Sequence, residues 1–174
     1  MVASEGVMMT EPGAEASHTQ EQSATNDAAT YAAHAHRLVA LATVLAGPSA
    51  AEDVVSSAVV RVLASPRWAR VDDRGAYLTR AVVNEVRSTH RRDLRRQTRE
   101  RRAALSSRHD APADSAPEVL SALAHLSVRQ RAVVFLTYWA DLTPAAVATE
   151  LEISEGAVRK HLARARRALR EELS

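Results

Sequence analysis

The sequence predicts an all-α protein that consists of two small helical domains joined by a flexible linker. Two observations favour helices. Aromatic residues make up only 3% of the chain and glycines number 5, whereas alanine, leucine and arginine dominate, a composition that suits helices and leaves little material for a sheet. Apolar residues also recur at spacings of three and four over most of the chain after residue 30, which is the period of an amphipathic helix.

The N-terminal segment differs from the rest in composition. Residues 1–27 are polar, contain five acidic residues and no lysine or arginine, and lack a hydrophobic period. We expect this acidic tail to be disordered because it has too little apolar surface to bury. All basic residues lie downstream, so the remainder of the chain is more basic than the formal net charge of +2 suggests.

A first domain, residues 28–103, is predicted to contain three helices. The first spans residues 30–45 and ends before Pro48. Ser49 can cap the second helix, which then carries acidic residues in its first turn, where they favour the positive helix start. These residues are Glu52 and Asp53.

The third helix changes character along its length. It follows a loop that bears Trp68, a candidate for stacking on an unpaired base, and it begins after Asp72 or Asp73. After Arg87 its apolar stripe gives way to a run of arginines, which requires an anionic partner or solvent. Asn84 lies at the junction, and its amide can both donate to and accept from a base edge.

A second domain, residues 118–174, follows the linker, residues 104–117. The linker is marked by its content of proline, serine and aspartate, which is typical of a domain boundary. We predict that the second domain begins with two helices and ends in a helix-turn-helix.

The helix-turn-helix is predicted over residues 142–169. Thr143 can cap its first helix, Pro144 needs no amide donor at the first position, and Ser154 can cap the second helix. Val158, Leu162, Ala165 and Leu169 form the apolar stripe of that second helix. A different face presents Arg159, Lys160, Ala163 and Arg164. With its N-terminal half in a major groove, such a helix contacts base edges and phosphates.

Catalytic, metal and cofactor sites are not expected. Glu52 and Asp53 are adjacent, so on a helix their carboxylates point about 100° apart and do not converge. The chain has no cysteine, His34 and His36 lie on different helix faces, and the other histidines stand alone. A glycine-rich phosphate loop and a serine nucleophile with a supporting base are both missing. We therefore do not expect an enzyme.

A membrane-spanning segment is not expected either. The longest apolar run, residues 38–46, is too short to cross a bilayer, and the N-terminus lacks the basic-then-apolar pattern of a signal peptide. Together with the lack of cysteine, these features predict a cytoplasmic protein without membrane insertion.

Three segments, in order, resemble the extracytoplasmic-function (ECF) class of bacterial sigma factors, over residues 31–173. Residues 51–63, AEDVVSSAVVRVL, are similar to the acidic-then-apolar helix with which that family binds core RNA polymerase. Residues 76–92, AYLTRAVVNEVRSTHRR, are similar to the helix that recognises and opens the −10 promoter element. Residues 126–154 resemble the segment that precedes the helix reading the −35 element.

The resemblance implies a partner for each group of residues. Core RNA polymerase would contact Glu52, Asp53, Val54, Val55 and Arg61. The −10 element of promoter DNA would contact Trp68, Asn84, Arg87, Ser88, Arg91 and Arg92. The −35 element would contact Arg159, Lys160, Ala163 and Arg164. Many relatives also bind an anti-sigma factor, which is a further candidate partner, and no cofactor is implied.

Some positions depart from the family's pattern. Ser56 and Ser57 replace a glutamine and an acid, and His161 takes a place often held by arginine at the DNA surface. Glu152 stands where the turn commonly has glycine. If that residue needs a positive φ, glutamate costs about 1 kcal/mol there.

Two other functions stay open from the residues alone. A stand-alone helix-turn-helix transcription regulator would bind duplex DNA without polymerase, usually as a dimer, although the sequence offers no phospho-acceptor domain and no evident dimer helix. A helical adaptor would bind an acidic protein partner with its basic faces. The adaptor would lack the salt-dependent affinity for promoter DNA that phosphate contacts produce.

Overall fold

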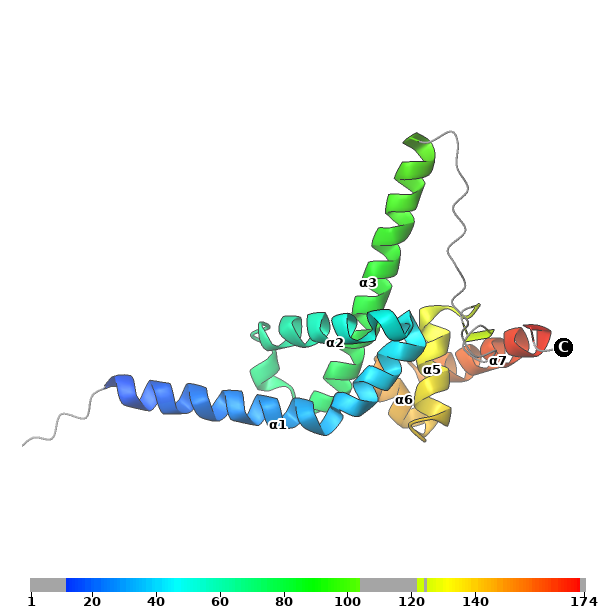
Figure 1. The fold of residues 1–174 in the computed structure, drawn as a ribbon. Coiled ribbons are helices and arrows are strands. Elements are labelled where there is room, and N and C mark those ends of the chain that lie inside the picture. The colour runs from blue at the N-terminus through cyan, green and yellow to red at the C-terminus, as the bar shows by residue number, and fades with distance from the viewer. Residues whose placement is uncertain (1–11, 104–121, 124, 173–174) are drawn as a thin grey trace, which may run out of the picture. The chain divides into compact units, whose positions relative to one another are not determined.

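The computed structural model describes residues 12–103, 122–123 and 125–172, and these ranges are helical without a single strand (Figure 1). The all-α prediction is therefore confirmed. The helices are α1 (Pro12–Ala46), α2 (Pro48–Leu63), the short 3-10 helix η1 (Trp68–Arg70), α3 (Arg74–Ala103), α5 (Val128–Tyr138), α6 (Pro144–Leu151) and α7 (Glu155–Glu172). The chain divides into two compact units, one ending at Ala33 and the other beginning at His34.

Helix α1 begins at Pro12, much earlier than the predicted start at residue 30. The expectation of a disordered tail is therefore wrong for residues 12–27, which are helical. The physical reason is that no glycine or proline occurs between Gly13 and Gly47, so nothing interrupts the helix, and proline is tolerated in a first turn. In the second unit, α1 buries three leucines as predicted: Leu38, Leu41 and Leu45.

Helix α2 begins at Pro48, and its N-cap is Gly47 rather than the predicted Ser49. Gly47 has a φ of 88°, a conformation that glycine adopts without strain, and Pro48 has no amide that would need an acceptor. Because the helix starts earlier, Glu52 and Asp53 lie beyond its first turn. The prediction that they favour the helix start is wrong.

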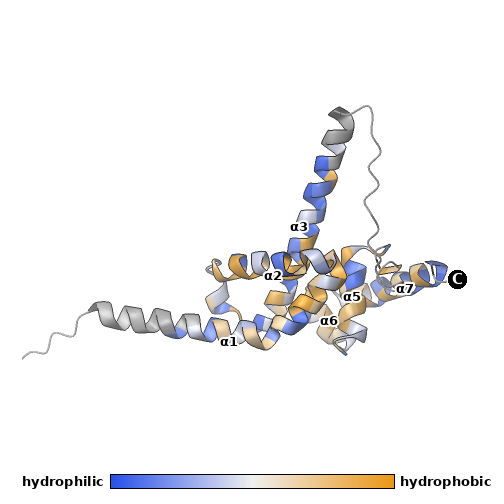
Figure 2. Cartoon of the chain, viewed as in Figure 1, coloured by the Kyte–Doolittle hydropathy of each residue, from blue (hydrophilic) through white to orange (hydrophobic). Residues whose placement is uncertain are grey.

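The first half of helix α3 contributes to the core, and the side chains that follow it are exposed. Asp73 caps it, since its Oδ1 accepts the Ala76 amide at 2.8 Å, as predicted. The first half packs against α2 and buries Ala76, Leu78, Val82, Val83 and Val86. From His90 to Arg96 the side chains are exposed, and this half is predominantly hydrophilic in Figure 2. The predicted change of character is confirmed for these residues.

Helices α5, α6 and α7 pack on one another around a core of fully buried side chains. Ser127 forms a capping box with Gln130 at the start of α5, which satisfies two amides that the helix leaves free. The core residues are Ala132, Val133, Leu136, Val147, Val158 and Ala165. The same stripe of α7 that the periodicity predicts therefore faces inward.

Helix α3 also packs against α5 and α6. Apart from residues 28–33, the described parts of both predicted domains thus belong to the compact unit that begins at His34. The predicted linker, residues 104–117, lies outside the described residues, so the domain boundaries stay a prediction.

The capping box at the start of α5 makes the first testable prediction. Ser127→Ala removes the side-chain acceptor of the Gln130 amide and should lower the free energy of unfolding by about 1 kcal/mol. Ser56→Ala, at an exposed position within α2, is the control and should change it by no more than about 0.5 kcal/mol. Urea unfolding measures both. Equal stability of the two variants would contradict the capping role.

Candidate nucleic-acid interface

The turn between α6 and α7 sets the direction of the second helix. Thr143 Oγ1 accepts the Ala146 amide and Ser154 Oγ accepts the Ala157 amide, each at 3.2 Å, so both predicted caps are confirmed. Between them Glu152 adopts the left-handed conformation, with φ 51° and ψ 51°. The Ile153 amide then donates to the Ala148 carbonyl at 3.0 Å, a bond that ends α6.

Helix α7 presents the predicted cationic residues on its exposed side. We call Arg159, Lys160, Ala163 and Arg164 the recognition face; all four side chains are exposed, whereas Val158 and Leu162 on the opposite side are buried. Arg159 forms a long ion pair of 3.4 Å with Glu155, and such exposed pairs contribute little. In the part of the chain that the structure describes, Lys160 and Arg164 have no carboxylate within 4.0 Å.

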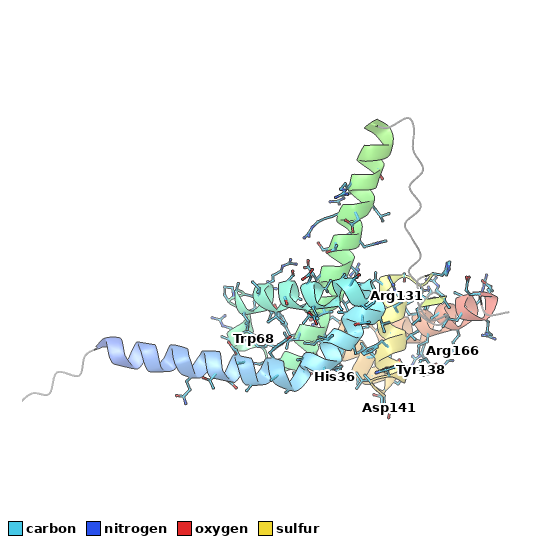
Figure 3. All side chains as sticks on the ribbon, in the orientation of Figure 1. His36, Trp68, Arg131, Tyr138, Asp141 and Arg166 are labelled. Atoms are coloured by element: carbon cyan, nitrogen blue, oxygen red, sulfur yellow. The ribbon has the colours of Figure 1, made fainter. Side chains whose placement is uncertain are left out.

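A side-chain hydrogen bond also connects α7 to α5. The Arg166 Nε donates to the Tyr138 hydroxyl at 2.9 Å, and the two side chains meet across the helices in Figure 3. Arg166 lies beside the recognition face rather than in it. This contact links the exposed sides of α5 and α7.

His161 lies between the cations of α7 and the core. Its Nδ1 is buried without a hydrogen-bond partner among the described residues. Burial, and then the charges of Arg129, Arg164 and Lys160, hold the pKa of His161 below its usual value of 6.5. The imidazole is therefore neutral at physiological pH, and the helix carries no extra cation at this position.

A second group of candidate DNA contacts lies on α3. We call Asn84, Arg87, Ser88, Arg91 and Arg92 the α3 basic face; Asn84, Arg91 and Arg92 are exposed and the other two are half-buried. Burial, and then the neighbouring Arg129 and Arg91, lower the pKa of Arg87, which remains charged because the pKa of arginine lies far above neutral pH. Cations that repel one another in this way favour an anion between them.

Asn84 opens onto a cavity of 420 Å³. The cavity is lined by three arginines together with a tyrosine and the exposed glutamate of the α6–α7 turn: Arg61, Arg67, Arg80, Tyr77 and Glu152. A planar, polar group could hydrogen-bond to Asn84 there. The Arg80 guanidinium lies over the ring of Tyr77, 5.6 Å from its centroid.

The sequence analysis predicts that Trp68 stacks on an unpaired base, and the structure contradicts this prediction. Its side chain is 5% exposed, and the Arg74 guanidinium covers its ring at 4.7 Å from the centroid. In this structure it belongs to the core and cannot stack on a base. Tyr77, whose ring centre lies 6.2 Å from that of Trp68, reaches the cavity instead.

The predicted polymerase contacts on α2 are only partly accessible. Val54 and Val55 are 8% and 1% exposed, so their assignment to a partner surface is wrong. They face the core because α2 packs on α3. Glu52, Asp53 and Arg61 are exposed as such a contact requires. Arg61 is paired with Glu85.

The exposed face of α2 includes two apolar residues outside the predicted set of polymerase contacts. Val60 is 68% exposed and Leu63 45%. Val60 and Leu63 lie seven and ten residues after Asp53, which is helical spacing. Because Asp53 marks the outer side of α2, this spacing could have predicted that both residues are exposed. We call Glu52, Asp53, Val60 and Leu63 the outer face of α2. Exposed apolar side chains beside charges are typical of a protein-binding surface.

Two kinds of feature are absent from the described residues, 12–103, 122–123 and 125–172. These residues contain no group of three or more His, Cys, Asp or Glu side chains that could hold a metal ion. No helix within the same ranges is long and apolar enough to cross a membrane.

A helix-turn-helix with an exposed cationic second helix defines a class of nucleic-acid-binding proteins, and comparison with known proteins narrows this class. A protein-family model described as "Sigma-70, region 4" matches residues 117–169. This range contains α5, α6 and most of α7, so the helix-turn-helix is that of a sigma-70 region 4 domain.

The similarity extends beyond this domain. The RNA polymerase sigma-E factor of Streptomyces coelicolor A3(2) is 29% identical over 136 residues, which cover 72% of this chain and 73% of the relative. The sigma factor RpoE of Bartonella quintana, solved in complex with the anti-sigma factor NepR, shares the fold with a TM-score of 0.64 at 22% identity; the match covers 82% of this chain and 93% of that one. The family model and the sequence relative make the chain similar to bacterial sigma factors, and the solved structure shows that it shares their fold.

The lowered pKa of His161 makes a prediction about pH. Because the folded state binds this proton less tightly than the unfolded state, stability is greatest above about pH 6.5 and falls as the pH drops toward the folded pKa. His161→Gln removes this contribution. Denaturant unfolding at about pH 7.5 and pH 5.5 should show a smaller loss of stability for the variant than for the wild type. An equal loss would contradict the assignment.

Proposed function

We propose that the protein binds core RNA polymerase and directs it to promoters whose −10 and −35 elements it contacts through two different helices. One observation carries this proposal: the helix-turn-helix that matches sigma-70 region 4 is part of a chain that carries a second, separate basic face on α3. A regulator that only bound duplex DNA would need the first surface alone.

The −35 element is assigned to the recognition face of α7. Lys160 and Arg164 are exposed without carboxylate partners among the described residues, so binding a phosphate breaks no ion pair. Arg159 is the candidate for a bidentate contact with a base, since its pair with Glu155 is long and exposed and arginine matches the acceptors of guanine. Ala163 is exposed on the same face and offers a methyl group for apolar contact with a thymine methyl group.

The −10 element is assigned to the α3 basic face. Asn84 supplies an amide that can read a base edge beside the cavity. Tyr77 supplies a stacking surface if a base displaces the Arg80 guanidinium, which lies over its ring at 5.6 Å from the centroid. Arg87, Arg91 and Arg92 supply sequence-independent affinity for phosphates, which weakens as salt rises. Opening DNA requires this combination of stacking and charge.

Core polymerase is assigned to the outer face of α2. Glu52 and Asp53 offer negative charge, and Val60 and Leu63 offer apolar surface that is otherwise exposed to water. Such a mixture fits a basic partner surface with an apolar centre. The buried Val54 and Val55 act indirectly, by holding α2 on α3.

Two further properties belong to the same proposal. We infer that the protein acts in the cytoplasm, where it would meet core polymerase, and as a binding factor rather than an enzyme. The RpoE relative is bound to the anti-sigma factor NepR, and a protein of that kind is a candidate partner for the exposed faces of α2 and α7.

Adding the purified chain to core RNA polymerase should yield promoter-dependent transcripts. Val60→Asp places a charge in the apolar part of the outer face and should reduce the affinity for core at least tenfold, a change of about 1.4 kcal/mol. Leu94→Asp is the matched control, because Leu94 is 49% exposed on α3 and outside this face. Tight DNA binding without core, and no transcripts with it, would instead identify a stand-alone regulator.

Replacement of Arg159 tests the docking of α7. Arg159→Ala should cost about 1–3 kcal/mol in promoter binding by the polymerase complex and should relax specificity at one base pair. Arg167→Ala is the control: both arginines form exposed pairs with a glutamate four residues away on α7, but Arg167 lies in the C-terminal half. Binding measurements on single-base-pair promoter variants distinguish the two. Equal effects would contradict docking through the N-terminal half of α7.

A further inference from the structure

Glu85 of α3 is a charged residue that helix packing buries. It is 5% exposed, although it directly follows Asn84, which is exposed. Neighbouring residues of a helix point about 100° apart, so Asn84 faces outward while Glu85 faces α2, on which the first half of α3 packs. A buried carboxylate is costly unless a cation compensates its charge. The proposed function assigns no role to Glu85.

The compensating cation is Arg61 of α2. Its Nη1 lies 2.5 Å from Glu85 Oε2, and the side chains of Arg61 and Glu85 are 60% and 6% exposed. The pair is therefore anchored at its buried carboxylate end, while the arginine side chain remains largely accessible. A guanidinium has five N–H donors in a planar fork, so the donor that faces Glu85 leaves others for a second acceptor.

Arg61 also lines the cavity beside Asn84. Another arginine of the cavity lining, Arg80, is already engaged by the protein. It donates to the Thr149 carbonyl at 3.2 Å, and its guanidinium lies over the ring of Tyr77. Arg61, in contrast, is held by a buried carboxylate and is open to solvent. A ligand in the cavity can therefore reach the guanidinium of Arg61 without displacing it from Glu85.

We propose that Glu85 is a positioning residue: its buried carboxylate holds the Arg61 guanidinium beside the cavity, where Arg61 contacts a phosphate of the DNA strand whose base meets Asn84. Arg61 then belongs to the −10 contacts and not to the polymerase contacts that the resemblance implies for it. This inference rests on the proposed function for the identity of the strand. The pair of Arg61 and Glu85 does not depend on that function.

The position of Arg61 before DNA binds determines how strongly it can contribute. A long, exposed side chain loses rotamer freedom when it binds a phosphate, and an arginine that is already held in place loses less. The Glu85 carboxylate also carries a negative charge, which by itself repels DNA. Positioning strengthens DNA binding and repulsion weakens it, so the effect of removing the carboxylate distinguishes the two.

The experiment uses the full-length chain and a short, fluorescent single-stranded DNA of random sequence at low salt. Glu85→Gln keeps the size of the side chain, removes its charge and releases Arg61. This substitution should weaken DNA binding about threefold and make binding less sensitive to salt. Urea unfolding verifies that each variant is folded. If Glu85→Gln binds the DNA as tightly as the wild type or more tightly, the proposal is overturned.

Asp93→Asn is the matched control. Asp93 is exposed on the same helix, and its substitution removes the same charge without releasing Arg61. We expect the affinity for the DNA to stay unchanged or to rise, because a negative charge has been removed. Equal weakening by Asp93→Asn and Glu85→Gln would show that the effect does not pass through Arg61, and it would also overturn the proposal.

A double-mutant cycle separates positioning from a general loss of structure. Arg61→Gln should weaken binding about fivefold and lower the salt slope by about 0.7, the value for one phosphate contact on a single strand. Glu85→Gln should then have no further effect, because Arg61 is no longer present. A loss of structure would weaken binding by the same factor with and without Arg61, and this result would refute the positioning role.

Arg61→Gln alone leaves the buried Glu85 without its cation and can fail to fold. In that case Glu85→Gln is compared with the double variant, since neither has an unpaired buried charge. The two should differ less than about twofold in affinity, because released Arg61 contributes little. A difference of about fivefold would show that Arg61 binds DNA without Glu85 and would overturn the proposal.

Transcription separates this proposal from the proposed function. Promoter-dependent transcripts with core polymerase are measured for the wild type. Their absence, together with the expected coupling of Arg61 and Glu85 in strand binding, would refute the proposed function and leave the positioning role in place. Normal transcription without that coupling would refute the positioning role alone.

Discussion

The left-handed turn at Glu152 is the constraint on which the rest of the structure depends. It allows α6 to end and α7 to begin within four residues, with Thr143 and Ser154 capping the two helices. The direction of α7, and therefore which of its side chains meet a DNA groove, follows from this turn and from the core beneath it. Because the residue is glutamate rather than glycine, the same turn also carries a carboxylate to Arg80. Glu152 thus sets both the direction of α7 and the position of a negative charge beside Arg80.

Two basic surfaces with different chemistry stand on this framework. The cations of α7 are exposed and backed by a neutral His161, an arrangement in which phosphates and base edges can be bound without a large cost of desolvation. The α3 surface adds an amide, a tyrosine and a cavity to its arginines, which suits unpaired bases better than a duplex. The outer face of α2 lacks this basic character and offers acidic and apolar groups instead. Three chemically distinct surfaces are what a factor that joins a polymerase to two promoter elements requires.

The features that the sequence predicted correctly are local ones. Caps at Asp73, Thr143 and Ser154, and the inward stripe of α7, depend on residues within four positions of each other. The errors arise at residues whose burial or pairing depends on contacts between different helices. Trp68 is buried beside Arg74 and Tyr77 of α3, and Val54 and Val55 face the core because α2 packs on α3. The pair of Arg37 and Glu150 spans 113 positions, and no spacing rule could have linked them. The early start of α1 was missed because polarity was taken as disorder, although alanine-rich polar segments also form helices.

The central claim is that α3 and α7 contact two separate promoter elements in the same complex. It is tested most directly by attaching a DNA-cleaving iron chelate to a single cysteine, introduced at Ser88 on α3 or at Ala163 on α7, in a chain that has no other cysteine. In the complex with core polymerase and promoter DNA, the account predicts strand cleavage near the −10 element from position 88 and near the −35 element from position 163. Cleavage at one shared location from both positions, or cleavage without any promoter dependence, would contradict it.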